Sequence, residues 1–184
     1  FGYTLEDIST VITPMATKGK EALGSMGIDT PLAVLSDQPQ LLYNYFKQLF
    51  AQVTNPPLDG IREEIITDIS LALGSDRNIF DIIPEHAKKL RINNPVISNN
   101  DLDKIKNLDH PDFKTVSIPI LYKISEGVNG LETALEDVIK LAEKAVFENA
   151  NIIILSDRNI DKDHAPIPAL LACSYVHHKL NQLQ

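Results

Sequence analysis

The residues with the most metal-like composition gather near the C-terminal end of the sequence, where Cys173 is followed by His177 and His178. A spacing of four places Cys173 and His177 on one face of a helix, and His164 could approach from the preceding loop. Zinc sites with recognisable spacing take paired ligands from two arms, and that pairing is absent here. A cysteine on the apolar stripe of a helix is most often a small hydrophobic residue. We therefore predict neither a metal site nor a cysteine nucleophile.

A second set of polar residues follows two apolar runs with the same outline, LAVLSD at 32–37 and IIILSD at 152–157. Each run reads as a buried parallel strand that ends in Leu-Ser-Asp. Ligands of parallel α/β folds bind at the carboxyl ends of strands, so Asp37, Asp157 and Arg158 are candidate site residues. Serine and aspartate also cap the helices that follow such strands, and capping is the favoured interpretation.

Other catalytic patterns are weak. The glycines at 24–27 precede the predicted strand, whereas the glycine turn of a phosphate loop follows one, and the glycines at 127–130 lack the required lysine and spacing. The pair Glu63-Glu64 is typical of an exposed helix start. The residues alone therefore predict no catalytic and no cofactor-binding side chain.

The first third of the chain predicts helices around one short strand. Thr4 caps a helix, with Asp7 three residues later, and Pro14 breaks or kinks it near Thr13. The run 31–35 predicts a buried strand, and a helix from Ser36 or Asp37 carries a broad apolar face as far as residue 53. The sequence Asn55-Pro56-Pro57 predicts a stiff corner after this helix, because proline fixes φ and restricts the residue before it.

The rest of the chain predicts alternating strands and helices. Residues 61–73 begin as a helix and end as a strand, and Ser98 caps a short helix over 101–108. The later elements are a strand at 115–124, with an edge position or bulge at Pro119, a long amphipathic helix from Gly130, a strand at 152–155, and a helix at 168–180 that buries Ala169, Ala172, Cys173, Val176 and Leu180. This order predicts an α/β architecture with right-handed crossovers.

Length and composition limit the remaining classes. The 184 residues suffice for a single domain, 1–184, in which 74–112 form an irregular excursion. A net charge of −8 without a basic block argues against a nucleic-acid partner, and no apolar run is long enough for a membrane span. One cysteine excludes an internal disulfide and fits a reducing, cytoplasmic setting. Because the sequence opens at Phe1 without methionine, we expect a piece of a longer chain.

Several longer strings carry a family resemblance. They are FGYT at 1–4, EALGSMG at 21–27, DTPLAVLS at 29–36, YFKQLFAQVTNPP at 45–57, ILSDR at 154–158, APIP at 165–168 and VHH at 176–178. In this order they resemble the central domain of the glutamate synthase large (alpha) subunit. Gly60 stands where that family leads us to expect proline, and residues 74–112 carry no matching motif.

The resemblance implies a partial, degenerate (β/α) barrel-like domain with a short parallel sheet flanked by helices. It implies a non-catalytic linker between a glutamine amidotransferase domain, with a terminal cysteine nucleophile, and an FMN-binding domain. The parent oxidoreductase would make L-glutamate from L-glutamine and 2-oxoglutarate, passing ammonia through a tunnel. FMN and a 3Fe-4S cluster belong to the following domain, so this chain alone is expected to hold no cofactor and to be inactive. A small reductase subunit or ferredoxin is the implied partner of the whole enzyme, and NADPH, NADH and ferredoxin all stay open as electron donor.

Within this family the stiff corner gains a candidate role. Thr54 and Asn55 are the residues that we expect at the ammonia tunnel or at the junction of domains. The alternatives from other classes are a free-standing α/β enzyme resembling a TIM barrel, or a ligand-binding module, each using the strand-end residues.

Overall fold

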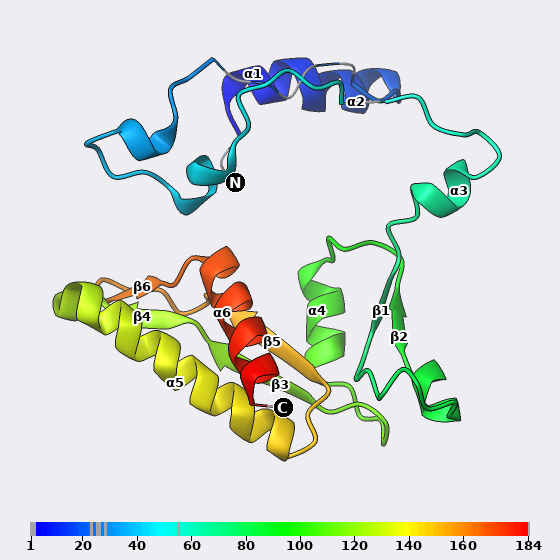
Figure 1. Ribbon diagram of the computed structural model, residues 1–184, viewed down its shortest axis with the longest axis vertical. Helices are drawn as coiled ribbons and strands as arrows, with labels where there is room; N and C mark the ends of the chain where they lie inside the picture. Colours follow the sequence, from blue (N-terminus) through cyan, green and yellow to red (C-terminus); the bar gives the residue numbers. More distant parts are fainter. Residues whose placement is uncertain (1–2, 23, 25–26, 28, 55, 184) are drawn as a thin grey trace. The chain divides into compact units, whose positions relative to one another are not determined.

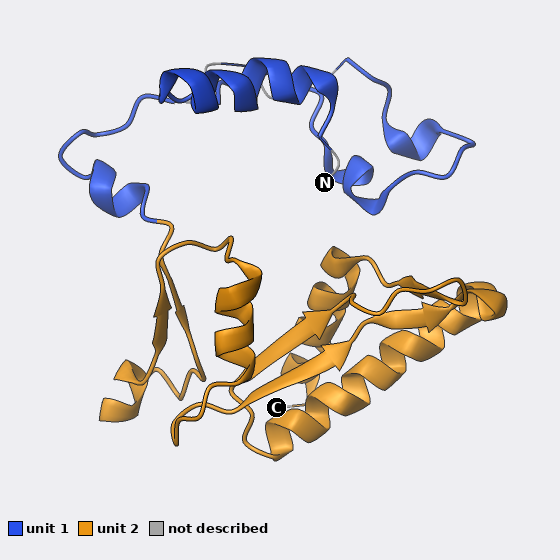
Figure 2. Ribbon diagram, turned by 180° about the vertical axis from the view of Figure 1, so that it is seen from behind, with its two compact units in different colours: residues 1–68 blue, residues 69–184 orange. Residues whose placement is uncertain are grey.

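The computed structural model describes residues 3–22, 24, 27, 29–54 and 56–183. The chain divides into two compact units, Phe1–Asp68 and Ile69–Gln184, drawn in two colours in Figure 2. Each unit has its own local structure and is considered by itself below.

Unit 1 consists of short helical segments joined by long loops (Figure 1). These are α1 (Leu5–Asp7), the π-helical η1 (Ile8–Ile12), α2 (Thr13–Lys18), the 3₁₀ turns η2 (Ala33–Leu35) and η3 (Leu42–Phe46), and α3 (Glu63–Ile66).

The predicted helix cap at Thr4 is confirmed. The Asp7 backbone N–H donates to Thr4 Oγ1 over 3.1 Å, and the Thr4 backbone N–H donates to Asp7 Oδ2 over 2.9 Å. This reciprocal pair is a capping box, which satisfies two of the amide groups that a helix start leaves without partners.

Near Thr13, where a break or kink is predicted, the helical conformation continues but its hydrogen-bond register changes. Pro14 stands in the first turn of α2, directly after the π-helical turn of η1. Proline has no N–H to donate one turn back, so the hydrogen-bond register changes where it enters the helix. Gly19 ends α2 in the left-handed region at φ 58°, with its N–H on the carbonyl of Met15 at 3.1 Å.

Two predictions for unit 1 are wrong. The run 31–35 is not a buried strand, because Ala33–Leu35 forms a 3₁₀ turn and Val34 is 70% exposed. The helix expected up to residue 53 is reduced to the 3₁₀ turn η3. An apolar run becomes a buried strand only when a partner strand and a covering layer exist, and strands β1–β6 of the described residues all lie in unit 2.

Unit 2 contains all these strands and the two longest helices (Figure 1). Its elements are β1 (Leu71–Leu73), the 3₁₀ turn η4 (Pro84–Ala87), β2 (Leu90–Ile92), α4 (Asn99–Lys106), β3 (Thr115–Pro119), β4 (Leu121–Lys123), the 3₁₀ turn η5 (Ile124–Glu126), α5 (Gly127–Phe147), β5 (Ile152–Ser156), β6 (His164–Pro166) and α6 (Ala169–Gln182). The helix-then-strand pattern at 61–73, the cap at Ser98, the strand at 152–155 and the last two helices are therefore confirmed. The helix after Ser98 covers Asn99–Lys106 instead of 101–108, and the single strand predicted at 115–124 is wrong, because the segment forms two strands, β3 and β4, with different partners.

The strands form small separate sheets. β3 and β5 pair in parallel from Thr115↔Ile152 to Pro119↔Ser156, while β4–β6 and β1–β2 are antiparallel pairs. The architecture is mixed α/β, as expected from the element order. The barrel-like arrangement is not found: over the described part of the chain each sheet has two strands, so no sheet closes on itself.

Pro119 marks the point where the chain changes partners. It is the last residue of β3, and the next residue, Ile120, donates its N–H to the Ser156 carbonyl at 2.9 Å. The Ile120 carbonyl then accepts from Ile167 N–H at 2.8 Å. Ile120, which is 1% exposed, therefore connects the β3–β5 pair to the segment that follows β6. A proline without an N–H is tolerated here because β3 pairs with β5 alone among the described strands, so the amides of alternate residues have no strand to bond.

The core of unit 2 lies where α5 packs against β3 and β4 and α6 packs against β5 and α5 (Figure 1). Ala142 of α5 and Ala172 of α6 are both fully buried, and small side chains allow close approach of the helices. The prediction that Cys173 is buried is wrong, because its side chain is exposed, as is Ala169. Helix α6 faces the core with Ala172 and Val176, and Cys173 lies one residue off that stripe.

Candidate functional site

Thr54, the first residue of the predicted corner, is fixed by the backbone of an earlier segment. Its Oγ1 accepts from Gly24 N–H at 3.0 Å, and its own N–H donates to the Gly24 carbonyl at 3.0 Å. The hydroxyl also lies 3.2 Å from the Gly24 carbonyl and 3.4 Å from the Ala22 carbonyl, to either of which it can donate. Thr54 therefore pins the start of the corner. Asn55, the other residue predicted at the domain junction, lies outside the described residues.

A second contact brings the same two segments together. A Cβ added to Gly27 would lie 2.8 Å from the Ala51 backbone and 2.8 Å from the Phe50 carbonyl. Such a separation is far below van der Waals contact, so only glycine allows this approach. Gly24 and Gly27 therefore lie against Thr54 and the Phe50–Ala51 backbone, a contact for which the sequence contains no periodic signal.

The two Leu-Ser-Asp sequences share a turn but not a strand. Ser36 Oγ accepts from Gln38 N–H at 3.1 Å, and Ser156 Oγ accepts from Arg158 N–H at 3.4 Å. This local i to i+2 bond is the serine turn that the sequence type favours. Only Ser156 ends a strand, and Asp37 and Asp157 belong to different units.

Arg158 is used within unit 2. Its Nη2 donates to Asn99 Oδ1 at 2.7 Å, which connects the end of β5 to the first residue of α4. The contact gives Arg158 a structural partner 59 residues away.

The cysteine and histidine residues do not converge. His177 and His178 have ring centroids 5.4 Å apart, and Asn181 Nδ2 lies 3.1 Å from His177 Nε2. His164 instead contacts Asp161, with Nδ1 2.9 Å from Oδ1. Over the residues that the structure describes, no group of three or more histidine, cysteine, aspartate or glutamate side chains is placed to hold a metal ion.

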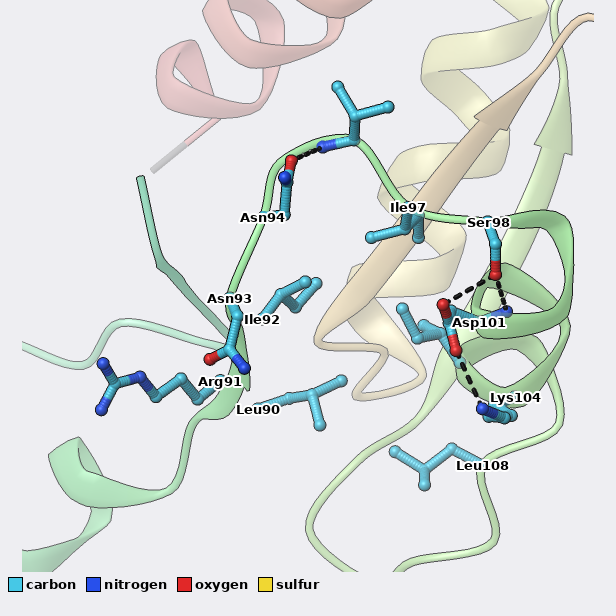
Figure 3. Close-up of a pocket in the computed structure, with 12 residues that line it drawn as sticks. Leu90, Arg91, Ile92, Asn93, Asn94, Ile97, Ser98, Asp101, Lys104 and Leu108 are labelled. Atoms are coloured by element: carbon cyan, nitrogen blue, oxygen red, sulfur yellow. Dashed lines mark hydrogen bonds and ion pairs between the residues drawn. The ribbon is translucent and has the colours of Figure 1, made fainter. Parts of the chain in front are cut away.

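A feature that the sequence did not predict is a groove between β2 and α4, with a cavity volume of about 470 Å³ (Figure 3). Leu90 and Ile92 from β2 and Leu108 beyond α4 provide apolar walls. The Ser98 hydroxyl donates to Asp101 Oδ2 at 2.7 Å, and Lys104 Nζ donates to Asp101 Oδ1 at 2.8 Å (Figure 3). Both hydrogen bonds lower the pKa of the Asp101 carboxyl, and the one from Lys104 has the larger effect.

Ser98, Asp101 and Lys104 therefore bind one another at the N-terminal turn of α4. Of the residues that form this groove, Ser98 was singled out by the sequence, as the cap of the helix that follows it. The other wall comes from β2, which pairs with β1. Each of these strands is three residues long, and so short a run shows little of the alternation by which a strand is predicted from sequence.

Comparison with known proteins decides the family. A family model described as the glutamate synthase central domain matches residues 1–184, which is the whole chain. The chain belongs to the glutamate synthase central domain family. The resemblance seen in the strings of residues 1–57 and 154–178 is thereby confirmed.

Individual relatives agree with this family. The chain is 46% identical to a glutamate synthase [NADH] of Schizosaccharomyces pombe, over 99% of this chain and 9% of the relative. It is 43% identical to the glutamate synthase [NADPH] large chain of Bacillus subtilis, over 98% of this chain and 12% of the relative. It is 42% identical to ferredoxin-dependent glutamate synthase 2 of Synechocystis, over 98% of this chain and 12% of the relative.

The central-domain match therefore spans about a tenth of the length of these relatives. In the described part of the chain, no helix combines the length and apolar character needed to cross a membrane.

Proposed function

We propose that this chain is the non-catalytic central domain of a glutamate synthase, an oxidoreductase that forms L-glutamate from L-glutamine and 2-oxoglutarate. The observation that carries the proposal is the family match over the whole chain, together with relatives that are all glutamate synthases. Residues 1–184 act as one domain in this proposal, because the match extends over both units, and 74–112 are an excursion within it.

In this role the domain connects a glutamine amidotransferase domain to an FMN-binding domain of the same polypeptide. The cysteine content of this chain supports placing the 3Fe-4S cluster in another domain of the parent enzyme. Iron–sulfur clusters are held by several cysteine thiolates, and Cys173 is the single cysteine of the sequence. The residues here do not fit the cluster, so no chemical step is assigned to them.

The electron donor is a property of the whole enzyme. Relatives named for NADH, NADPH and ferredoxin match this chain at 46%, 43% and 42% identity, so the central domain does not distinguish the donors. A small reductase subunit or ferredoxin would accordingly bind another part of the parent protein.

We further propose that the corner at Thr54 and Asn55 shapes the ammonia tunnel where domains meet. The support is the stiffness of the segment: Thr54 is pinned to Gly24 by bonds in both directions, and two prolines follow at 56 and 57. A pinned corner holds its carbonyl groups at fixed positions, as a tunnel wall requires.

The test uses the full-length parent enzyme. Thr54→Phe should lower the ratio of glutamate formed to glutamine hydrolysed, because ammonia would escape to solvent. Thr54→Ser, which keeps the hydroxyl, should leave the ratio unchanged. An unchanged ratio in Thr54→Phe, with the protein folded, would reject the tunnel role.

A separate test addresses the non-catalytic assignment. The purified 184-residue chain should stay colourless during titration with FMN and should not turn over glutamine. A yellow, flavin-binding chain would favour the free-standing enzyme with strand-end residues instead.

A further inference from the structure

A long loop joins the two strands of the β1–β2 hairpin. β1 ends at Leu73 and β2 begins at Leu90, so residues 74–89 form the connection, which includes the 3₁₀ turn η4 (Figure 1). Each strand has three residues, and so short a ladder provides few hydrogen bonds to hold the ends of a loop of this length together. The base of the loop therefore needs a further contact.

The ammonium group of Lys89 supplies this contact. Its Nζ donates to the Gly74 carbonyl at 3.2 Å and to the Ser75 carbonyl at 2.9 Å, and it forms an ion pair with the Asp76 carboxylate. An ammonium group has three N–H donors, and three consecutive residues provide one oxygen each. The hydrogen bond from Lys89 lowers the pKa of the Asp76 carboxyl, which keeps the carboxylate charged at neutral pH.

The backbone at Gly74 is adapted to this contact. Its φ of 143° lies in a region that side chains disfavour. A Cβ added to Gly74 would lie 3.1 Å from the Lys88 carbonyl and 3.3 Å from Lys89 Cδ. Glycine therefore allows the turn that brings two carbonyl groups to the ammonium, and it leaves room for the stem of the lysine side chain.

Other lysines of unit 2 form exposed ion pairs. Lys88, Lys104 and Lys140 each donate to one carboxylate, and their side chains are 50%, 77% and 70% exposed. The Lys89 side chain is 17% exposed. A charge partly withdrawn from water needs hydrogen-bonding partners to compensate, and here the carbonyl groups add to the carboxylate. Residues 74–76 therefore surround the ammonium group more completely than a surface ion pair does.

We propose that residues 74–76 form a binding site for a primary ammonium group, that the Lys89 side chain is its resident ligand, and that this occupancy closes the base of loop 74–89. The ligand class follows from the three oxygens, since a primary ammonium group offers each of them one donor. A guanidinium group holds its donors in a planar fork and suits this arrangement less well. The inference does not depend on the proposed function, because every residue that carries it lies in unit 2.

The main experiment is chemical rescue of Lys89→Ala in the full-length parent protein. Alanine keeps Cβ, so propylammonium corresponds to the part of the side chain that is removed. Hydrogen exchange of peptides from residues 71–92, followed by mass spectrometry, should become several-fold faster in the variant and return towards the wild-type rate as propylammonium is added. Tetramethylammonium, which carries the charge but no N–H, should not restore it.

Three outcomes of the rescue experiment would overturn the proposal. They are unchanged exchange in Lys89→Ala, faster exchange that propylammonium does not reverse, and equal reversal by tetramethylammonium. Lys88→Ala is the matched control, because Lys88 Nζ donates to Asp112 Oδ1 alone, at 2.7 Å. Exchange of the same peptides should change little in this control and should not respond to propylammonium. Equal acceleration in the two variants would also contradict a specific site.

A second measurement uses the wild-type protein and decides the matter even if Lys89→Ala does not fold. In limited reductive methylation followed by mass spectrometry, Lys89 should react several-fold more slowly than the 77% exposed Lys104. Asp76→Ala removes one oxygen of the site from a side chain that is 84% exposed, and should speed methylation of Lys89 but not of Lys104. Equal wild-type rates for the two lysines, or no effect of Asp76→Ala on Lys89, would overturn the proposal.

Discussion

Thr54 and Gly24 bind each other in both directions: each donates its backbone N–H to the other residue, over 3.0 Å to the Gly24 carbonyl and 3.0 Å to the Thr54 hydroxyl oxygen. This clamp joins segments 30 residues apart in a unit that has no buried side chain among its described residues. Order in this part of the protein therefore depends on a few polar contacts.

The first prediction concerns that clamp. Thr54→Val keeps the shape of the side chain but removes the acceptor of Gly24 N–H, so the local stability should fall by up to about 1 kcal/mol. Exchange of the Gly24 amide, followed by NMR, should become faster. Thr54→Ser retains the hydroxyl and serves as the control; equal exchange in Val and Ser variants would contradict the clamp.

The second prediction concerns the core of unit 2. Ile118 is 1% exposed and Ile82 is 102% exposed, so the same change tests burial at two extremes. Ile118→Ala should lower the free energy of unfolding by about 2–5 kcal/mol, through lost burial and the cavity left behind. Ile82→Ala should change it by less than about 0.5 kcal/mol. Urea unfolding followed by circular dichroism measures both, and similar losses would be incompatible with this core.

The third prediction concerns glycines. A Cβ on Gly130 would meet Glu126 Cβ at 2.7 Å and the Lys123 carbonyl at 2.9 Å, while a Cβ on Gly60 has nothing within 4 Å. Gly130→Ala should destabilise unit 2 by about 1–3 kcal/mol despite the higher helix propensity of alanine. Gly60→Ala should be neutral or slightly stabilising, because it restricts the unfolded chain. Thermal unfolding distinguishes them; a stabilised Gly130→Ala would refute the close packing.

The fourth prediction concerns pH. The hydrogen bond from Lys104, with that from Ser98, lowers the pKa of Asp101, so the folded state binds this proton less readily than the unfolded state. The stabilisation is complete above the unfolded value of about 4 and is lost as the pH falls through the lower folded value. An NMR titration should show the Asp101 carboxyl titrating below its ordinary range. Lys104→Met should raise that pKa, and an unchanged titration would contradict the contact.

The sequence determined the helix cap at Thr4 in unit 1, the local elements of unit 2, and the family. The apolar face of α5, the run 152–155 and the caps at Thr4 and Ser98 depend on neighbours within a turn or a strand, and each was found where predicted. Family strings are equally local, because they are read residue by residue.

Tertiary structure alone decided how these elements combine. The change of partner at Ile120, the exposure of Cys173 and the groove between β2 and α4 depend on chain segments far apart in sequence, which no periodicity records. Residues 31–35 give the clearest case. Their apolar pattern predicts burial, but burial needs a covering surface, and the described residues of unit 1 leave Val34 70% exposed. An apolar pattern shows that a segment favours burial, but whether the segment is buried depends on the packing of other parts of the protein against it.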